Sequence, residues 1–467
     1  MPPIPNTCGN VIPRAMSRRD LLKTVAGGFG WLAFAGLNAQ ASPALASASL
    51  APREPHFLPR ARRVIFLCMQ GGPSHLDTFD YKPQLSRDTG KPGVAKGGGS
   101  ALFASPFEFR QHGESGLWIS ELYPEVARQA DKLCVINSMK TDIPSHPQAF
   151  TQLHTGSARF VRPSLGSWVL YGLGTPNQNL PGFISISPPL QFGAGNFGSA
   201  FLPAMFQGTR LGAQRENLSV ASMGNLENVD RTPAEQRRHL DLVQAMNRQF
   251  LEADPANSEV EGVIHSYELA FRMQSEVPHL LDISGETEAT RKLYGIGDSV
   301  TDDFGRQCLL ARRFAEAGVR FIEVCHAGWD QHQNLTAAIR KNTSSTDRPI
   351  AALLRDLEAR GLLDDTLVLW GGEFGRTPDS RKPDGRDHNA KGFSMWLAGG
   401  GTRGGMNYGA TDQYGWEAVD RPMHVHDLHA TLLHALGLDH ERLTYHYGGR
   451  DYRLTDVYGD VATGVLG

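Results

Sequence analysis

Short apolar runs alternate with helical patterns along most of this chain, and no other feature constrains its fold as strongly. Each run is bounded by turn-forming residues and is typical of a buried strand. The runs are Val64–Met69, Leu133–Ile136, Arg320–Cys325, Thr366–Trp370 and Phe393–Ala398. Helical patterns at Phe304–Ala317 and Ile350–Ala359 each precede a strand. This order predicts right-handed crossovers and therefore an α/β three-layer sandwich, with a largely parallel central sheet and helices on both faces.

The range from about 156 to 299 breaks this alternation. Its first half is rich in proline, glycine, asparagine and serine, and its second half is helical. Leu242, Met246 and Phe250 are spaced for one face of a helix. We interpret this range as a mostly loop and helical insertion in a single domain that spans residues 62–467. The insertion is expected to cover one edge of the sheet and to shape substrate access.

The first 46 residues differ from the rest and are typical of an export signal. Arg18 and Arg19 precede a weakly apolar stretch from Thr24 to Leu37, and Ala44-Leu45-Ala46 offers a cleavage site. The pattern predicts twin-arginine-type export to the periplasm or the cell exterior. No later run reaches the roughly 18 apolar residues that a membrane helix needs, so we expect no stable membrane span in the mature protein.

Charge and cysteine usage exclude some partners and leave the thiol state open. The net charge of −3 over 467 residues gives no global field for nucleic acid or an anionic membrane. The cysteines of the mature chain are Cys68, Cys134, Cys308 and Cys325. None has the C-x-x-C spacing, so we expect buried free thiols, with a disulfide as the alternative in an oxidising compartment.

Polar residues follow the predicted strands where each strand ends. In chain order they are His75 and Asp77, then Lys140, Thr141, Ser145 and His146, then Asp330 and His332, then Glu373 and Arg376, and finally Asp387 and His388. Parallel strands end at one edge of a sheet, where open α/β folds bind ligands, so these side chains are expected to meet. Asp, Glu and His are ligands for zinc, manganese or calcium, which predicts a site for one or two divalent ions, with zinc favoured.

Individual roles follow from residue chemistry. We assign metal binding to Asp77, Asp330, His332, Glu373 and His388. Arg376 and Lys140 are suited to hold an anionic substrate. Asp77 has an alternative role as a helix cap, and His75, His146 and Asp387 are either ligands or residues that orient ligands. His429 and His434, at helical spacing near the C-terminus, are expected to have no role.

Three segments carry a resemblance to a known family. They are Gln70–Asp80, Trp370–Pro378 and Gly385–Asn389, the last followed by Trp396–Gly401. The chain resembles the domain of unknown function 1501 family, which is placed in the alkaline phosphatase-like superfamily beside sulfatases and phosphodiesterases. The resemblance implies an alkaline phosphatase-like fold, an early metal ligand at Asp77, and a nucleophile at Thr141. It also implies that Asp330 and His332 form the superfamily's Asp…His pair and that His388 is its late histidine.

Two departures from the superfamily pattern bear on the chemistry. The usual Asp-His-Gly segment is replaced by Glu373-Phe374-Gly375, which removes one histidine ligand. An extra residue before Pro144 leaves Ser145 as a rival nucleophile. The segment that sulfatases convert to formylglycine is not found, which counts against a standard sulfatase.

The sequence therefore predicts an exported, metal-dependent hydrolase of phosphate or sulfate esters, acting on a small-molecule or saccharide ester. A non-catalytic secreted binding protein on a hydrolase-like scaffold is the alternative from another class, because one fold hosts many functions. A mutase or transferase is a third option and would need a second acceptor pocket.

Overall fold

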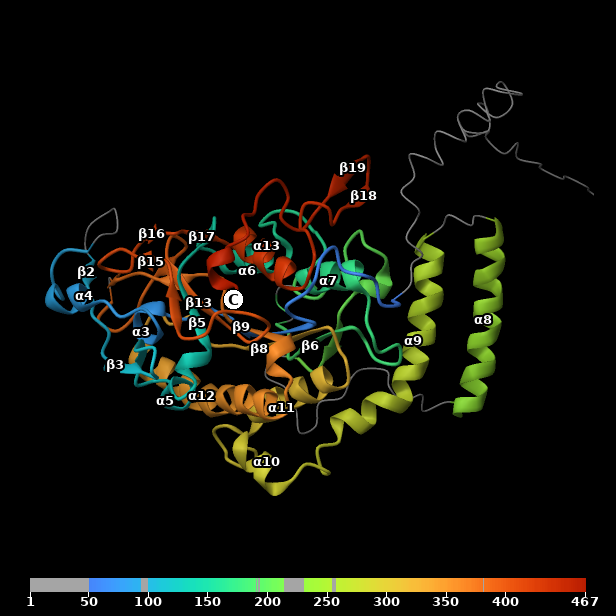
Figure 1. The fold of residues 1–467 in the computed structure, drawn as a ribbon, viewed down its shortest axis with the longest axis horizontal. Helices are drawn as coiled ribbons and strands as arrows, with labels where there is room; N and C mark the ends of the chain where they lie inside the picture. Colours follow the sequence, from blue (N-terminus) through green and yellow to red (C-terminus); the bar gives the residue numbers. More distant parts are fainter. Residues whose placement is uncertain are drawn as a thin grey trace, which may run out of the picture. The chain divides into compact units, whose positions relative to one another are not determined.

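A nine-stranded sheet organises the part of the chain that the structure describes (Figure 1). The structure is a computed structural model, and it describes residues 50–93, 100–189, 191, 194–213, 231–253, 258–380 and 382–467. The predicted export signal lies outside these residues. In order across the sheet, the strands are β14 (Met406–Tyr408), β5 (Leu133–Lys140), β13 (Phe393–Ala398), β9 (Thr366–Gly371), β1 (Arg63–Met69), β8 (Phe321–His326), β6 (Phe183–Ile186) and β7 (Thr209–Leu211), and β17 (Met423–His424) pairs with β5.

The sheet is parallel except at one strand. β13 runs antiparallel to both of its neighbours, β5 and β9. Every other pairing in this sheet is parallel. The loops that follow β1, β5, β8 and β9 therefore leave the sheet at the same edge, and the segment that enters β13 starts there too. This confirms the predicted largely parallel sheet.

Helices cover both faces of the sheet, as predicted (Figure 1). One layer contains α11 (Asp302–Glu316) and α12 (Leu335–Ala359), and the opposite layer contains α6 (His146–Thr155), α7 (Leu165–Leu173) and α13 (Val425–Ala435). Strands β9 and β13 are buried along their whole length. Their near-continuous apolar sequences are explained by this double cover, since a strand packed on both faces has no solvent-facing positions.

The helix α12 begins at Leu335, well before the predicted start at Ile350. Its first half is rich in threonine and serine, which have low helix propensity and hide the helical pattern. Two of these hydroxyls instead bond within the helix: Thr343 donates to the carbonyl of Ile339 at 3.0 Å, and Thr346 to that of Asn342 at 2.9 Å. The helix therefore extends through a segment whose composition favours turns.

The predicted insertion at about 156–299 is partly wrong. Strands β6 and β7 belong to the main sheet, because β6 pairs with β8 in parallel and β7 pairs with β6. They are short and lie among glycine- and proline-rich segments, so their local pattern did not stand out. Outside the sheet, α8 (Pro233–Ala253) packs on α9 (Ser258–Leu281). The helical face of Leu242, Met246 and Phe250 is exposed by 61%, 54% and 67% rather than packed on the core.

Several short elements complete the described residues. The helices are α3 (His75–Thr78), α4 (Pro83–Arg87), α5 (Pro124–Ala127) and α10 (Glu288–Leu293), with single 3-10 turns at Ala130–Lys132, Ala204–Phe206, Leu363–Asp365 and Thr463–Val465. Five two-stranded ribbons are formed by β2 (Ala101–Leu102) with β11 (Asp379–Ser380), β3 (Phe109–His112) with β4 (Leu117–Ser120), β10 (Gly375–Arg376) with β12 (His388–Asn389), β15 (Ala410–Thr411) with β16 (Ala418–Asp420), and β18 (Tyr445–Tyr447) with β19 (Arg450–Tyr452). Among the described helices, none has the length and apolar character to cross a membrane. The predicted buried free thiols are confirmed at Cys68, Cys134, Cys308 and Cys325.

Candidate metal centre

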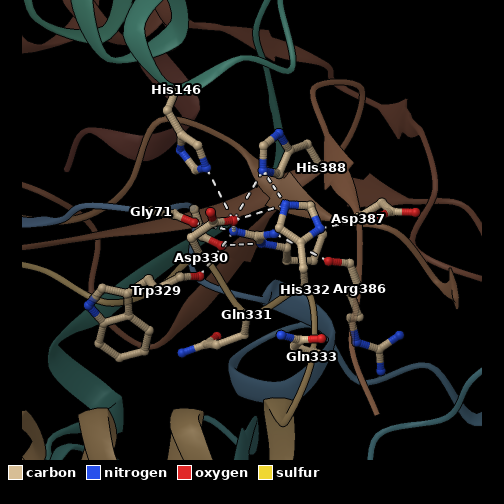
Figure 2. A network of polar contacts seen from close by, with 12 residues as sticks. Gly71, His146, Trp329, Asp330, Gln331, His332, Gln333, Arg386, Asp387 and His388 are labelled. Atoms are coloured by element: carbon tan, nitrogen blue, oxygen red, sulfur yellow. Dashed lines mark hydrogen bonds and ion pairs between the residues drawn. The ribbon is translucent and has the colours of Figure 1, made fainter. Parts of the chain in front are cut away.

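Three histidines surround one aspartate at the carboxyl edge of the sheet (Figure 2). The Nε2 atom of His146 lies 3.2 Å from Oδ1 of Asp330, that of His388 lies 3.2 Å from the same oxygen, and that of His332 lies 3.1 Å from it. The Nε2 atoms of His332 and His388 are 2.9 Å apart. We call these three residues the histidine cluster. His146, Asp330 and His388 each offer a ligand atom within 4.8 Å of the other two, and His332 lies beside them next to Asp330 and His388.

Each member of the cluster comes from a different part of the fold. His146 opens α6, in the loop that follows β5, and Asp330 and His332 follow β8. His388 lies on β12, which pairs with β10, so that His388 faces Arg376 in register. The parallel direction of β5 and β8 delivers two of these segments to one edge, as the sequence predicts, and the β10–β12 ribbon folds the third over them.

The outer nitrogens of the three rings are all held by an acceptor. His146 Nδ1 lies 2.7 Å from Oε1 of Glu373, and His332 Nδ1 lies 3.1 Å from Oδ1 of Asp387. His388 Nδ1 donates to the carbonyl oxygen of Pro144 at 2.9 Å, since a carbonyl can only accept. Protons on the Nδ1 atoms leave the Nε2 lone pairs directed inward. This arrangement, with a carboxylate or carbonyl behind each imidazole, is the one that orients metal-binding histidines.

The residues present fit a divalent cation. The buried Nε2 atom of His146 makes no hydrogen bond of normal geometry in the described structure, although it faces Asp330. Separations of 2.9–3.2 Å between neighbouring ligand atoms are close to those expected around a cation with bonds of about 2.0–2.2 Å. The donor set of imidazole and carboxylate suits zinc, and manganese less well.

Charge in the centre keeps Asp330 ionised and acts on the histidines in opposite directions: burial alone would lower the pKa of His146, but contacts with Asp330 and Glu373 raise it to about 9. Burial alone would raise the pKa of Asp330, but contacts with His146, His388 and Arg376 hold it far below its ordinary value. Asp330 is therefore a carboxylate under all ordinary conditions. Burial and the charge of Arg376 lower the pKa of His332, which favours the neutral imidazole that metals bind.

Arg376 does not face a substrate, contrary to its predicted role. It is fully buried, and its guanidinium donates to the carbonyl oxygens of Gly71, Gly72, Trp329 and Arg386 and to the carboxylate of Asp330. These acceptors follow β1 and β8 or precede β12, so Arg376 ties the loops of the centre together. The planar guanidinium group makes arginine a good anion ligand, but here it donates mainly to backbone carbonyls.

Asp77 stands apart from the histidine cluster. Its two oxygens accept from Arg386, at 2.8 Å for Nε and 3.2 Å for Nη2, and one of them also accepts from Ser74. Asp77 and Arg386 are both fully buried. Asp77, predicted to be a metal ligand, is thus the partner of the buried Arg386. Arg386 lies two residues before His388, so this pair fixes the segment that carries that histidine. Nothing in the local sequence of Gly385–Asn389 indicates that Arg386 is buried.

Glu373 lies behind His146 and does not point at the cluster's centre. Its side chain is fully buried, and both of its oxygens accept from the amide of Gly71. We expect Glu373→Gln to retain one bound cation at saturating metal but to weaken its affinity about 10- to 100-fold, because the imidazole of His146 loses its anionic support. Competition with a chelator measures this, and Glu358→Gln on the exposed face of α12 is the matched control. Complete loss of the cation would make Glu373 a direct ligand.

The other predicted residues lie around the centre without joining it. Thr141 donates its hydroxyl to Gln152 at 2.9 Å and is 8% exposed. Ser145 donates to Gln148, and His75 is buried with its Nε2 atom 2.9 Å from the carbonyl oxygen of Gly415. Lys140 lines a separate cavity of about 570 Å³ with Asp142, His424, His426 and Tyr458. The cavity and the histidine cluster flank the same loop, since the loop begins after Lys140 and its Pro144 carbonyl accepts from His388.

Solved structures of three other proteins are similar to this chain. The lipoteichoic acid synthase LtaP from Listeria monocytogenes is 8% identical, with 87% of this chain and 78% of that chain covered and a TM-score of 0.36. The PsFucS1 sulfatase from Pseudoalteromonas sp. is 14% identical, with 82% of this chain and 69% of that chain covered and a TM-score of 0.36. The alkaline phosphatase from the Antarctic bacterium TAB5 is 10% identical, with 73% of this chain and 92% of that chain covered and a TM-score of 0.31. No curated protein matches the chain. A family described as "Protein of unknown function (DUF1501)" matches residues 61–466, which is most of the chain. The chain belongs to this family.

Proposed function

We propose that this chain is an exported hydrolase of phosphate or sulfate esters that works with a divalent cation held by the histidine cluster and Asp330. The observation that carries the proposal is the convergence of three Nε2 atoms within 3.2 Å of one carboxylate oxygen, each ring being oriented from behind. One cation accounts for this donor set, with zinc favoured and manganese or calcium as alternatives. Export rests on the paired arginines in the first 46 residues.

A cation bound there would act as a Lewis acid on an ester oxygen and lower the pKa of an attacking water. The chain's own residues would bind and orient the substrate. Asp330 and His332 have side chains that are 46% and 36% exposed, so the centre is open to a substrate from solvent. A catalytic zinc site has three protein ligands and one open position, and His146, Asp330 and His388 as the ligands would leave that position free.

Water is the nucleophile that the geometry favours, in place of the predicted Thr141. In this reaction a water oxygen bonds to phosphorus or sulfur, the ester bond breaks, and the alcohol leaves with a proton. The hydroxyl of Thr141 is occupied by Gln152, whose amide in turn donates to Asp142. Thr141 therefore supports the loop between Lys140 and His146.

Thr141→Ala tests the two nucleophiles against each other. If water attacks, kcat is expected to fall by no more than about threefold in Thr141→Ala and likewise in Ser145→Ala, which removes the rival nucleophile on the same loop. If Thr141 attacks, its removal would cost roughly 10⁴-fold or more, as loss of a covalent nucleophile does. Steady-state turnover of an aryl ester by the mature protein measures the difference.

The cavity beside Lys140 is suited to the organic part of the ester. Its lining combines the lysine with carboxylates, two histidines and the ring of Tyr458, which stacks on His426 with ring centroids 5.2 Å apart. Such a mixture of hydrogen-bonding groups and an aromatic face fits a polar small molecule or a saccharide. Lys140 keeps the role proposed from the sequence, to hold an anionic group.

The function itself is tested with purified mature protein on an aryl phosphate and an aryl sulfate. We expect stoichiometric metal, turnover of at least one ester, and loss of turnover on chelation with recovery on adding metal. Bound metal without turnover on a broad ester panel would instead support the binding protein on a hydrolase-like scaffold. The observation that favours that alternative is the hydrogen bond from the hydroxyl of Thr141 to Gln152, which leaves no free hydroxyl at the predicted nucleophile.

A further inference from the structure

A second group of metal-binding residue types is buried between the sheet and α6, and the proposed hydrolysis does not use it. Its members are Cys68 on β1, Glu323 and Cys325 on β8, and His154 on α6. Their exposed fractions are 0%, 0%, 4% and 3%. We call them the buried cysteine group. A glutamate is seldom fully buried unless it is paired with another polar group or a metal.

The fold brings the group together by strand register and helix packing. β1 and β8 are parallel, and Cys68 pairs with Cys325 in register. Side chains alternate along a strand, so Glu323 points to the same face as Cys325. His154 lies on that face, its ring packed between Phe150 and Phe66 with centroids 4.3 and 5.6 Å away.

The ligand atoms of Cys68, His154 and Glu323 are close to one another. His154 Nε2 lies 2.6 Å from Oε1 of Glu323 and 3.9 Å from Sγ of Cys68. Cys325 lies beside Cys68 in register on the neighbouring strand, and burial raises the pKa of its thiol well above the ordinary value. One sulfur, one imidazole nitrogen and one carboxylate oxygen thus lie within 4.8 Å of one another in a buried space, with Cys325 on the strand beside Cys68.

The atoms that face away from this point are held by other groups. His154 Nδ1 donates to the carbonyl of Phe150 at 2.8 Å, which leaves Nε2 as the inward nitrogen. Oε2 of Glu323 accepts from Ser185 and from Asn196, both at 2.6 Å, which leaves Oε1 inward. The inward atoms are therefore preset for a common ligand, as around structural metals.

A hydrogen-bonded ion pair between His154 and Glu323 is the simpler account of two of these residues. It leaves the two adjacent thiols without a purpose, and a buried ion pair often contributes little to stability. A tetrahedral zinc ion with bonds of about 2.0–2.3 Å needs ligand atoms roughly 3.3–3.8 Å apart. The Cys68–His154 separation is close to this, and the His154–Glu323 hydrogen bond would widen by about 0.7 Å through side-chain rotation.

We propose that the buried cysteine group binds a thiophilic divalent cation of the zinc class as a structural site, separate from the histidine cluster. Protein ligands without solvent access are typical of a structural zinc site, and Cys325, beside Cys68 in register, would supply the fourth ligand. The two sites are joined by α6, because His146 and His154 are eight residues and therefore about 12 Å apart along that helix. The cation would link β1, β8 and α6, and Asp330 follows β8 while His146 begins α6.

Metal content and cobalt spectra of the mature holoprotein test this proposal. We expect two zinc equivalents in the unmodified protein and one in Cys68→Ser, while Cys134→Ser, which alters a buried free thiol on β5, keeps both. Protein produced with cobalt should show a thiolate-to-cobalt charge-transfer band in the near ultraviolet. That band should survive in His388→Ala and disappear in Cys68→Ser.

Two results would overturn the proposal. One is cobalt-loaded unmodified protein without the charge-transfer band. The other is equal metal content in Cys68→Ser and Cys134→Ser. The spectrum of the unmodified protein requires no variant, so it decides the question even where Cys68→Ser fails to fold. Neither measurement depends on hydrolysis, so the outcome is separate from that of the proposed function.

Discussion

His388→Ala is expected to remove the cation of the histidine cluster and with it all metal-dependent turnover. A cation at a thousandfold excess over its dissociation constant stabilises a protein by about 4 kcal/mol when it binds only the folded state. On titration with zinc the free energy of unfolding should rise by about this much more in the unmodified protein than in His388→Ala, because zinc at the buried cysteine group stabilises both. Urea unfolding with and without added zinc, together with metal analysis, measures the effect.

The control for this variant is His446→Ala, because His446 is exposed and pairs only with the exposed Asp451. His446→Ala should show the same zinc-dependent increase in the free energy of unfolding as the unmodified protein. If His388→Ala kept both the full stabilisation by zinc and the full metal content, the histidine cluster would not be a metal centre, and the proposed hydrolase would lose its basis. The buried cysteine group should be unaffected in either case.

Asp77→Ala is expected to destabilise the protein by about 3–5 kcal/mol, because it leaves the charge of Arg386 buried without a partner. Both side chains are fully buried, so solvent does not screen the pair. Breaking the exposed pair of Asp420 and Arg421 by Asp420→Ala should cost less than about 1 kcal/mol. Chemical unfolding of both variants checks the contrast.

The double variant Asp77→Ala with Arg386→Met separates the pair from the packing around it. Its stability should exceed that of Asp77→Ala alone, since no unpaired charge remains. A ligand role for Asp77 predicts another result: loss of a bound cation with little change in the stability of the metal-free protein. Metal analysis of Asp77→Ala therefore distinguishes a ligand from the partner of Arg386.

Much of the fold could be predicted from the chain alone. The run Phe393–Ala398 has the predicted bounds, and the other four predicted strands differ only at their ends. Family membership, predicted from the segments around Asp77, Glu373 and His388, is confirmed. The strands β6 and β7 were missed, because a short strand in a glycine- and proline-rich region is specified by its partner more than by its own sequence.

The candidate site was predicted in place but not in detail. The chain order of strands and polar loops indicated that Asp330, His332 and His388 would meet, and the structure brings them together with His146. The sequence did not show that Asp77 pairs with Arg386 or that Arg376 is enclosed by carbonyl oxygens. Asp77 and Arg386 are 309 positions apart, and two acceptors of Arg376, Gly71 and Gly72, are 305 and 304 positions from it.

The sequence by itself determined the layered α/β architecture and the edge at which the polar side chains gather, because strand direction and apolar periodicity are local properties. Only the tertiary structure decided which of those side chains face a common point and which bind one another. The reason is physical: a carboxylate at a strand end must find a partner once buried, and whether that partner is an arginine or a cation depends on side chains brought in by distant segments.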